Sequence, residues 1–92
     1  MHPTPLPDLI LYSRPGCGLC DEARRDVRTL LEARRTAGLA TPSLIERDIT
    51  TDPDWERAFF GSIPVLELGE RRLELATSPA RVRRLLIDVL DA

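Results

Sequence analysis

The chain has 92 residues, a formal net charge of −2 and a hydrophobic fraction of 42%, so one small globular domain is expected. The slightly negative charge argues against nucleic acid or an anionic membrane as the main partner. All thirteen basic residues are arginine, which we attribute to a bacterial genome rich in G and C. Paired arginines such as Arg34-Arg35 are interleaved with acidic residues and are expected on solvated faces.

Residues 1–8 are predicted to form an extended, proline-rich arm, and residues 9–92 a single domain. The arm contains the only histidine, His2, for which we expect no functional role. It has no apolar run of the kind found in a signal peptide or a membrane anchor. We therefore expect a cytoplasmic protein, and we also expect a monomer.

A strand, a long helix and a second strand are predicted in the first half of the domain. The apolar run over residues 9–13 lies between turn-forming residues and indicates a buried strand. The helix is expected from about residue 17 to residue 37, where Gly38 ends it. Its predicted buried side consists of Leu19, Ala23, Val27, Leu30 and Leu31. The second strand is expected over residues 43–49.

A short helix follows, with Asp52 as its N-cap and Pro53 at its first position. Trp55 and Phe59 stand four residues apart on this helix, and we expect core or semi-buried packing for both, with contact to a substrate as the minor alternative.

A hairpin and a last helix complete the chain. Residues 63–68 and 71–75 alternate around a two-residue turn that contains glycine, which is typical of a β-hairpin. Ser78 is the predicted N-cap of the last helix, which carries an apolar stripe. The order is thus β-α-β-α-β-β-α, which predicts an α/β fold with a four-stranded mixed sheet and helices on both faces.

The motif Cys17-Gly18-Leu19-Cys20 contains the only two cysteines and stands where the first strand gives way to the first helix. Cysteines three residues apart on the first turn of a helix fall on one face, close enough to form a disulfide. Free amides and the helix dipole at that end favour a thiolate, so we expect a lowered pKa for Cys17. Cys20 lies one turn inside and should be shielded. A Cys-x-x-Cys motif in this setting indicates redox chemistry.

The order of elements and the segments 12–17 and 60–66 resemble the thioredoxin fold and, within it, the glutaredoxin family, in particular small bacterial glutaredoxin-like proteins. The resemblance implies a cis peptide bond between Ile63 and Pro64, facing the cysteines. An extended substrate could then pair with the backbone of Ile63. Arg14 matches the basic residue that stands three positions before the first cysteine, where it could favour the thiolate and meet a substrate carboxylate.

The sequence departs from the glutaredoxin pattern after the hairpin. The usual Gly-Gly and acidic residue are replaced by Leu75-Ala76-Thr77-Ser78, in the segment that holds the γ-glutamyl end of glutathione in that family. Thr77, Ser78 and the nearby helix amides could still bind a carboxylate, although Ser78 also fits a plain N-cap.

These observations predict an enzyme that reduces protein or small-molecule disulfides by using the Cys17–Cys20 dithiol. We expect no bound cofactor and no metal, a thiol reductant as electron donor, and glutathione as a candidate co-substrate. Two alternatives remain open. The first is a metal or Fe–S protein, which would need ligands beyond the single Cys-x-x-Cys. The second is a non-catalytic interaction module.

Overall fold

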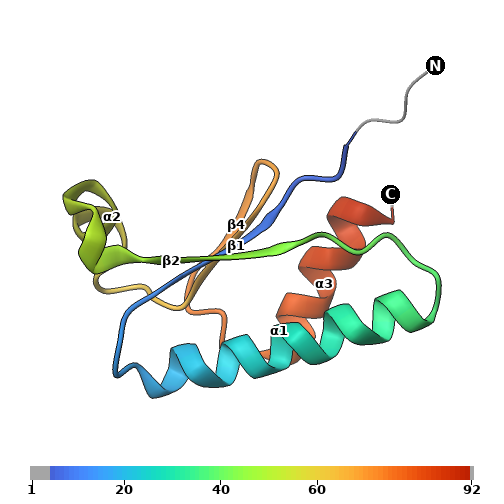
Figure 1. Cartoon of the computed structure of the whole chain (residues 1–92), viewed down its shortest axis with the longest axis horizontal. Helices are drawn as coiled ribbons and strands as arrows, with labels where there is room; N and C mark the ends of the chain where they lie inside the picture. The colour runs from blue at the N-terminus through green and yellow to red at the C-terminus, as the bar shows by residue number, and fades with distance from the viewer. Residues whose placement is uncertain (1–4, 92) are drawn as a thin grey trace.

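The structure is a computed structural model that describes residues 5–91. Residues 1–4 of the predicted arm, His2 among them, lie outside the described residues. Within residues 5–91 the elements follow the predicted order, β-α-β-α-β-β-α, with one short 3₁₀ turn added (Figure 1). Their bounds are β1 Leu9–Ser13, α1 Gly18–Thr36, β2 Leu44–Asp48, η1 Ile49–Thr51, α2 Pro53–Phe59, β3 Val65–Leu68, β4 Arg71–Leu73 and α3 Pro79–Leu90.

The predicted helix starts are confirmed by their caps. The Asp52 carboxylate accepts a hydrogen bond from the amide of Asp54, and the Ser78 hydroxyl accepts one from the amide of Arg81. The prediction for the last strand was too long, because β4 ends at Leu73. Leu75 has a backbone φ of +47°, in the left-handed region that a strand residue does not adopt.

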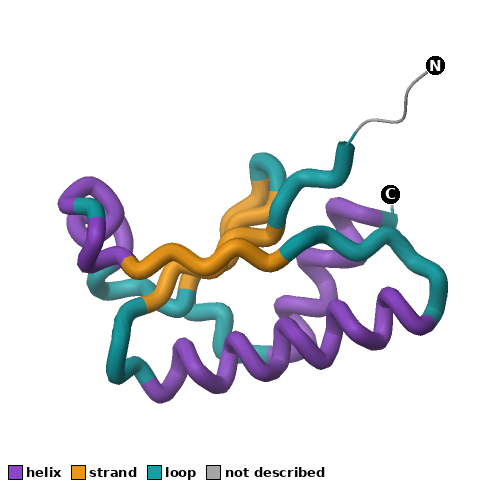
Figure 2. Tube along the Cα trace, in the orientation of Figure 1, coloured by secondary structure: helices purple, strands orange, loops and turns teal. Residues whose placement is uncertain are grey.

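The four strands form one mixed sheet in the order β2-β1-β3-β4 (Figure 2). β1 is parallel to β2 and antiparallel to β3, and β4 is antiparallel to β3. Leu11 lies opposite both Glu46 of β2 and Leu66 of β3, so β1 runs through the middle of the sheet. The end of β1 therefore delivers the cysteine motif to the edge where β3 begins.

Alternation along the strands divides the core between the two faces of the sheet. One face carries Leu9, Leu11, Leu66 and Leu68, which are buried against α1 and α3. Figure 1 shows these two helices side by side on the same face. The other face carries a smaller cluster of Tyr12, Ile49, Phe59 and Val65, packed with Trp55. The predictions of helices on both faces and of core roles for Trp55 and Phe59 are confirmed.

The predicted buried side of α1 was wrong at two positions. Leu19 is 50% exposed, whereas Arg34 is only 7% exposed. The buried stripe instead runs through Cys20, Ala23, Val27, Leu31 and Arg34. Each residue turns the helix by about 100°, so Leu19, next to the fully buried Cys20, points away from the sheet.

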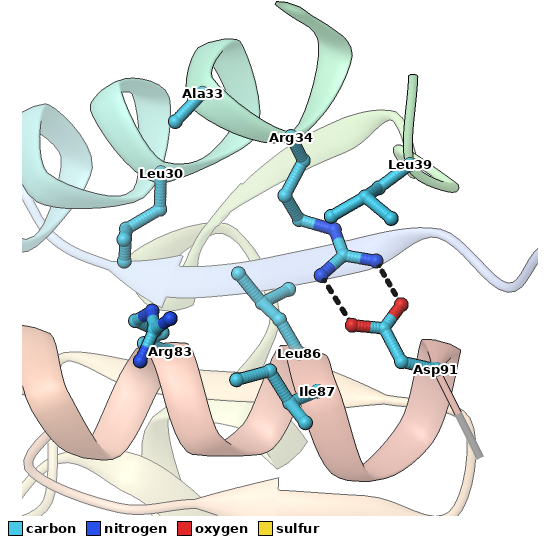
Figure 3. A pocket seen from close by; sticks show the side chains of 8 residues that line it. All are labelled: Leu30, Ala33, Arg34, Leu39, Arg83, Leu86, Ile87 and Asp91. Atoms are coloured by element: carbon cyan, nitrogen blue, oxygen red, sulfur yellow. Dashed lines mark hydrogen bonds and ion pairs between the residues drawn. The ribbon is translucent and has the colours of Figure 1, made fainter. Parts of the chain in front are cut away.

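Arg34 is buried because its charge and its hydrogen-bond donors are satisfied within the fold. Its Nε donates to the carbonyl oxygen of Ala40, and its two terminal nitrogens donate to both carboxylate oxygens of Asp91. Figure 3 shows this pair closing one end of a pocket between α1 and α3. The expectation that the Arg34-Arg35 pair is solvated therefore holds for Arg35 alone.

None of the helices among residues 5–91 combines the length and the apolar character needed to cross a membrane.

Candidate functional site

Cys17 and Cys20 form a disulfide at the start of α1, with their Cα atoms 5.2 Å apart. Cys17 is the N-cap of the helix, and its sulfur accepts a hydrogen bond of 3.1 Å from the amide of Cys20. An N-cap side chain that accepts from the first turn occupies the position where free amides favour negative charge. The structure thus brings the two predicted sulfurs together at a helix N-terminus.

The two sulfurs differ in exposure. Cys20 is fully buried, while Cys17 is partly exposed. A bulky disulfide can therefore reach Cys17 and cannot reach Cys20 without opening the fold. The sulfur that Cys20 can reach is the Cys17 sulfur beside it.

The turn before the helix explains why Cys17 lies at the N-terminus of α1. β1 ends at Ser13, and the chain reverses through Arg14, Pro15 and Gly16. Gly16 has a φ of +74°, which glycine adopts without the penalty paid by other residues. The next residue, Cys17, returns to extended backbone and begins the helix.

Ile63 and Pro64 lie beside this turn, and their peptide bond is cis, as the family resemblance implies. Tyr12 pairs with Val65, the first residue of β3, so Ile63 and Pro64 come just before the paired part of β3, at the end of the sheet where the chain leaves β1. Pro64 is buried and Ile63 is half-buried. No backbone hydrogen bond to the N–H or C=O of Ile63 is present in the described part of the chain. Its role in substrate binding stays a prediction.

Arg14 forms an ion pair with a residue of α2. One of its terminal nitrogens lies 3.7 Å from a carboxylate oxygen of Glu56, and the guanidinium lines a shallow groove with Phe60. Hydrogen bonds from Thr50 hold the pKa of the Asp48 carboxyl below its usual value, and the charge of Arg14 lowers it further. The predicted role of Arg14 toward a thiolate or a substrate carboxylate is untested, and its charge is shared with these acids.

Fewer amide donors are free near Thr77 and Ser78 than the sequence suggested. The amide of Thr77 donates to the carbonyl oxygen of Leu75, and the Ser78 hydroxyl caps the amide of Arg81. Pro79 has no N–H, so Ala80 supplies the one remaining amide in the first turn of α3. Carboxylate binding at Thr77 and Ser78 stays a prediction.

The exposure of three large apolar side chains was not predicted: Leu19, Phe60 and Leu75. Helical phase relative to a buried Cys20 could have revealed Leu19. No pattern in the sequence signals the left-handed conformation of Leu75, because leucine rarely adopts it.

Among residues 5–91, no three or more His, Cys, Asp or Glu side chains come together in a way that could hold a metal ion. A metal or cluster at Cys17 and Cys20 would need ligands from outside this part of the chain.

Comparisons with known proteins agree with this geometry. Residues 8–89 match the family described as "Glutaredoxin-like domain (DUF836)". The chain is also similar to a solved structure titled Northeast Structural Genomics target protein XcR50 from X. campestris. The two share 27% identity over 87% of this chain and 96% of that one, with a TM-score of 0.69. No curated protein matches the sequence. With a thioredoxin-like fold and a family match over nearly its whole length, the chain belongs to the glutaredoxin-like family.

Proposed function

We propose that this protein is a thiol–disulfide oxidoreductase that reduces disulfides with its Cys17–Cys20 dithiol. The single observation that carries the proposal is the asymmetry of the two sulfurs. Cys17 is partly exposed and accepts a hydrogen bond from the first turn of α1, while its partner Cys20 is fully buried beside it. An attacking thiolate and a protected resolving thiol need this arrangement.

The reaction proceeds in two exchanges. The Cys17 thiolate attacks one sulfur of the substrate disulfide, which forms a mixed disulfide and releases the other sulfur as a thiolate. The Cys20 thiol then loses its proton to solvent and attacks the Cys17 sulfur. The Cys17–Cys20 bond closes and the second substrate thiolate leaves. The dithiol has lost two electrons to the substrate, and a thiol reductant restores it.

Two features support a place for the substrate beside Cys17. The backbone of Ile63, next to the cis Pro64, could pair with an extended substrate segment. Arg14 could bind a substrate carboxylate if it leaves Glu56. Substrates of either protein or low-molecular-weight type fit this site, with glutathione as a candidate co-substrate. We further propose action in a bacterial cytoplasm, as a monomer and without a bound cofactor.

The test uses Cys20→Ser, which removes the resolving thiol. Incubated with a disulfide substrate, this variant should accumulate a mixed disulfide on Cys17 that mass spectrometry detects. Cys17→Ser is the matched control, because it keeps one cysteine of the same motif but places it in the buried position. If Cys17→Ser forms the adduct as fast as Cys20→Ser, or retains disulfide-reducing activity, the proposed function is wrong.

A further inference from the structure

A hollow of about 180 Å³ lies between β4 and α3, and we call it the arginine hollow. Its lining residues are Arg71, Arg72, Leu73, Arg81, Arg84 and Leu85. Arg72 adds little to the charge here, because its guanidinium binds Glu67 and lies over the ring of Phe59, which packs on the other face of the sheet. The positive charge of the arginine hollow therefore comes from the other three arginines.

These three arginines have little counter-charge. Arg81, Arg84 and Asp88 are spaced three and four residues apart, so they share one side of α3. Within residues 5–91 the only acid that pairs with the three is Asp88, whose carboxylate oxygens lie 3.9 Å from a nitrogen of Arg71 and 3.7 Å from one of Arg84. Both distances exceed the roughly 2.7–2.9 Å of a charged hydrogen bond. Three positive charges and one negative charge leave a surplus of two, in a chain whose net charge is −2.

The order of charges along α3 is unfavourable for the helix itself. The helix dipole favours acidic side chains in the first turn and basic side chains in the last. The helices α1 and α2 follow this rule, whereas α3 has no acid in its first turn and no base in its last. Its arginines, Arg81, Arg83 and Arg84, stand in its first half instead. A local rule that is broken with no compensating contact in the fold is typical of a functional site.

We propose that the arginine hollow binds the phosphate group of a small phosphate monoester. Guanidinium groups bind phosphate oxygens through pairs of parallel hydrogen bonds. A phosphate monoester carries about −1.5 to −2 charges at neutral pH, which matches the surplus of two, whereas a single carboxylate would neutralise half of it. The volume is below the roughly 300–1,000 Å³ of pockets for drug-sized ligands, so it suits one compact charged group. None of these residues takes part in the proposed reaction of Cys17.

The experiment compares phenyl phosphate with benzoate, two probes that share a ring and differ in the charge of their anionic group. Their dissociation constants (Kd) are measured at one ionic strength from the NMR shifts of backbone amides in residues 71–73 and 81–85. Phenyl phosphate should bind at least about threefold more tightly than benzoate, because it meets the surplus charge more fully. Equal affinities would overturn the proposal.

Arg84→Gln removes one guanidinium and should raise the Kd for phenyl phosphate about three- to fivefold, which is the upper range for an exposed charged contact. Arg83→Gln is the matched control, because it removes the same charge one residue away. Its side chain lines the pocket between α1 and α3 instead (Figure 3). The Kd should therefore stay unchanged in Arg83→Gln, and an equal rise in both variants would reduce the site to diffuse positive charge and overturn the proposal.

Asp88→Asn tests the same site in the opposite direction. It removes the acid that competes for Arg71 and Arg84, so the Kd for phenyl phosphate should fall about three- to fivefold. Tighter binding cannot result from a loss of folding, so this variant decides the matter if Arg84→Gln does not fold. Asp54→Asn, which removes an acid paired with Arg57 on α2, should leave the Kd unchanged. A Kd for Asp88→Asn no lower than that for Asp54→Asn would also overturn the proposal.

Discussion

The ion pair between Arg14 and Glu56 allows a quantitative test of how this site receives a charged substrate. If Arg14 binds a substrate carboxylate, it must first give up its contact with Glu56 on α2. Glu56→Gln removes the competing charge and keeps the size of the side chain. We therefore expect this variant to reduce carboxylate-bearing disulfides faster than the wild-type protein does.

The structure limits the size of this gain. The two side chains are 41% and 44% exposed and their nearest charged atoms are 3.7 Å apart, so solvent screens the pair. Exposed ion pairs contribute about 0.2–1 kcal/mol, which corresponds to about a 1.4- to 5-fold gain in affinity when the competition is removed. The gain should shrink as salt is added, because the Debye length is about 8 Å at physiological ionic strength and falls to about 3 Å, shorter than the separation of this exposed pair, at 1 M salt.

The assay measures kcat/KM for dithiodipropionate, which carries two carboxylates, relative to neutral 2-hydroxyethyl disulfide. Asp54→Asn is the matched control, because it removes a negative charge two residues away on the same helix, from a carboxylate that pairs with Arg57. An Arg14→Leu background should abolish the effect of Glu56→Gln, which completes a double-mutant cycle. Equal ratios for Glu56→Gln and Asp54→Asn would refute the role given to Arg14 and leave only a general charge effect.

Two further predictions concern stability. Leu66 is fully buried in the sheet opposite Leu11, so Leu66→Ala should lower the free energy of unfolding, measured in urea, by about 2–5 kcal/mol. The exposed Ile45 of β2 is the control, and Ile45→Ala should change the free energy of unfolding by less than about 0.5 kcal/mol. Similar losses for the two variants would contradict the position of Leu66 in the core. Hydrogen bonds from Arg34 hold the pKa of the Asp91 carboxyl below its ordinary value of 3.8, so its contribution is complete above that value and is lost as the pH falls through the lower folded-state pKa. The difference in unfolding free energy between the wild type and Asp91→Asn should thus be constant above about pH 5 and close toward about pH 2, and a difference that persists at the acid end would contradict this assignment.

Local signals in the sequence were enough for the order of elements and for most of their ends. Asp52 and Ser78 are capping residues followed by proline, and both start the helices that they predict. Such signals act over a few residues and need no knowledge of the rest of the fold. The burial of Arg34 was not predicted, because its partner Asp91 lies 57 residues away and no local pattern joins them.

The candidate site likewise combines features that the sequence predicts with features that depend on tertiary contacts. The adjacency of Cys17 and Cys20 follows from helix geometry, and the cis bond before Pro64 follows from family resemblance. The position of Arg14 beside Glu56 depends instead on how α2 docks against the end of β1. The left-handed Leu75 depends on two backbone hydrogen bonds to the segment before β3. Both contacts are tertiary, so propensity and periodicity contain no information about them.

The difference in exposure between the two sulfurs is a consequence of core packing. Cys20 continues the stripe of Ala23, Val27 and Leu31 that buries one side of α1, so the same contacts that hold the helix on the sheet enclose the Cys20 sulfur. Cys17 is one turn earlier along that stripe, at the N-terminus of the helix, where the core leaves its side chain partly exposed. Shifting either cysteine by one residue would turn its sulfur by about 100° around the helix. The phase of α1 therefore sets which sulfur is exposed and which is buried, and in the proposed reaction this difference sets which cysteine attacks first.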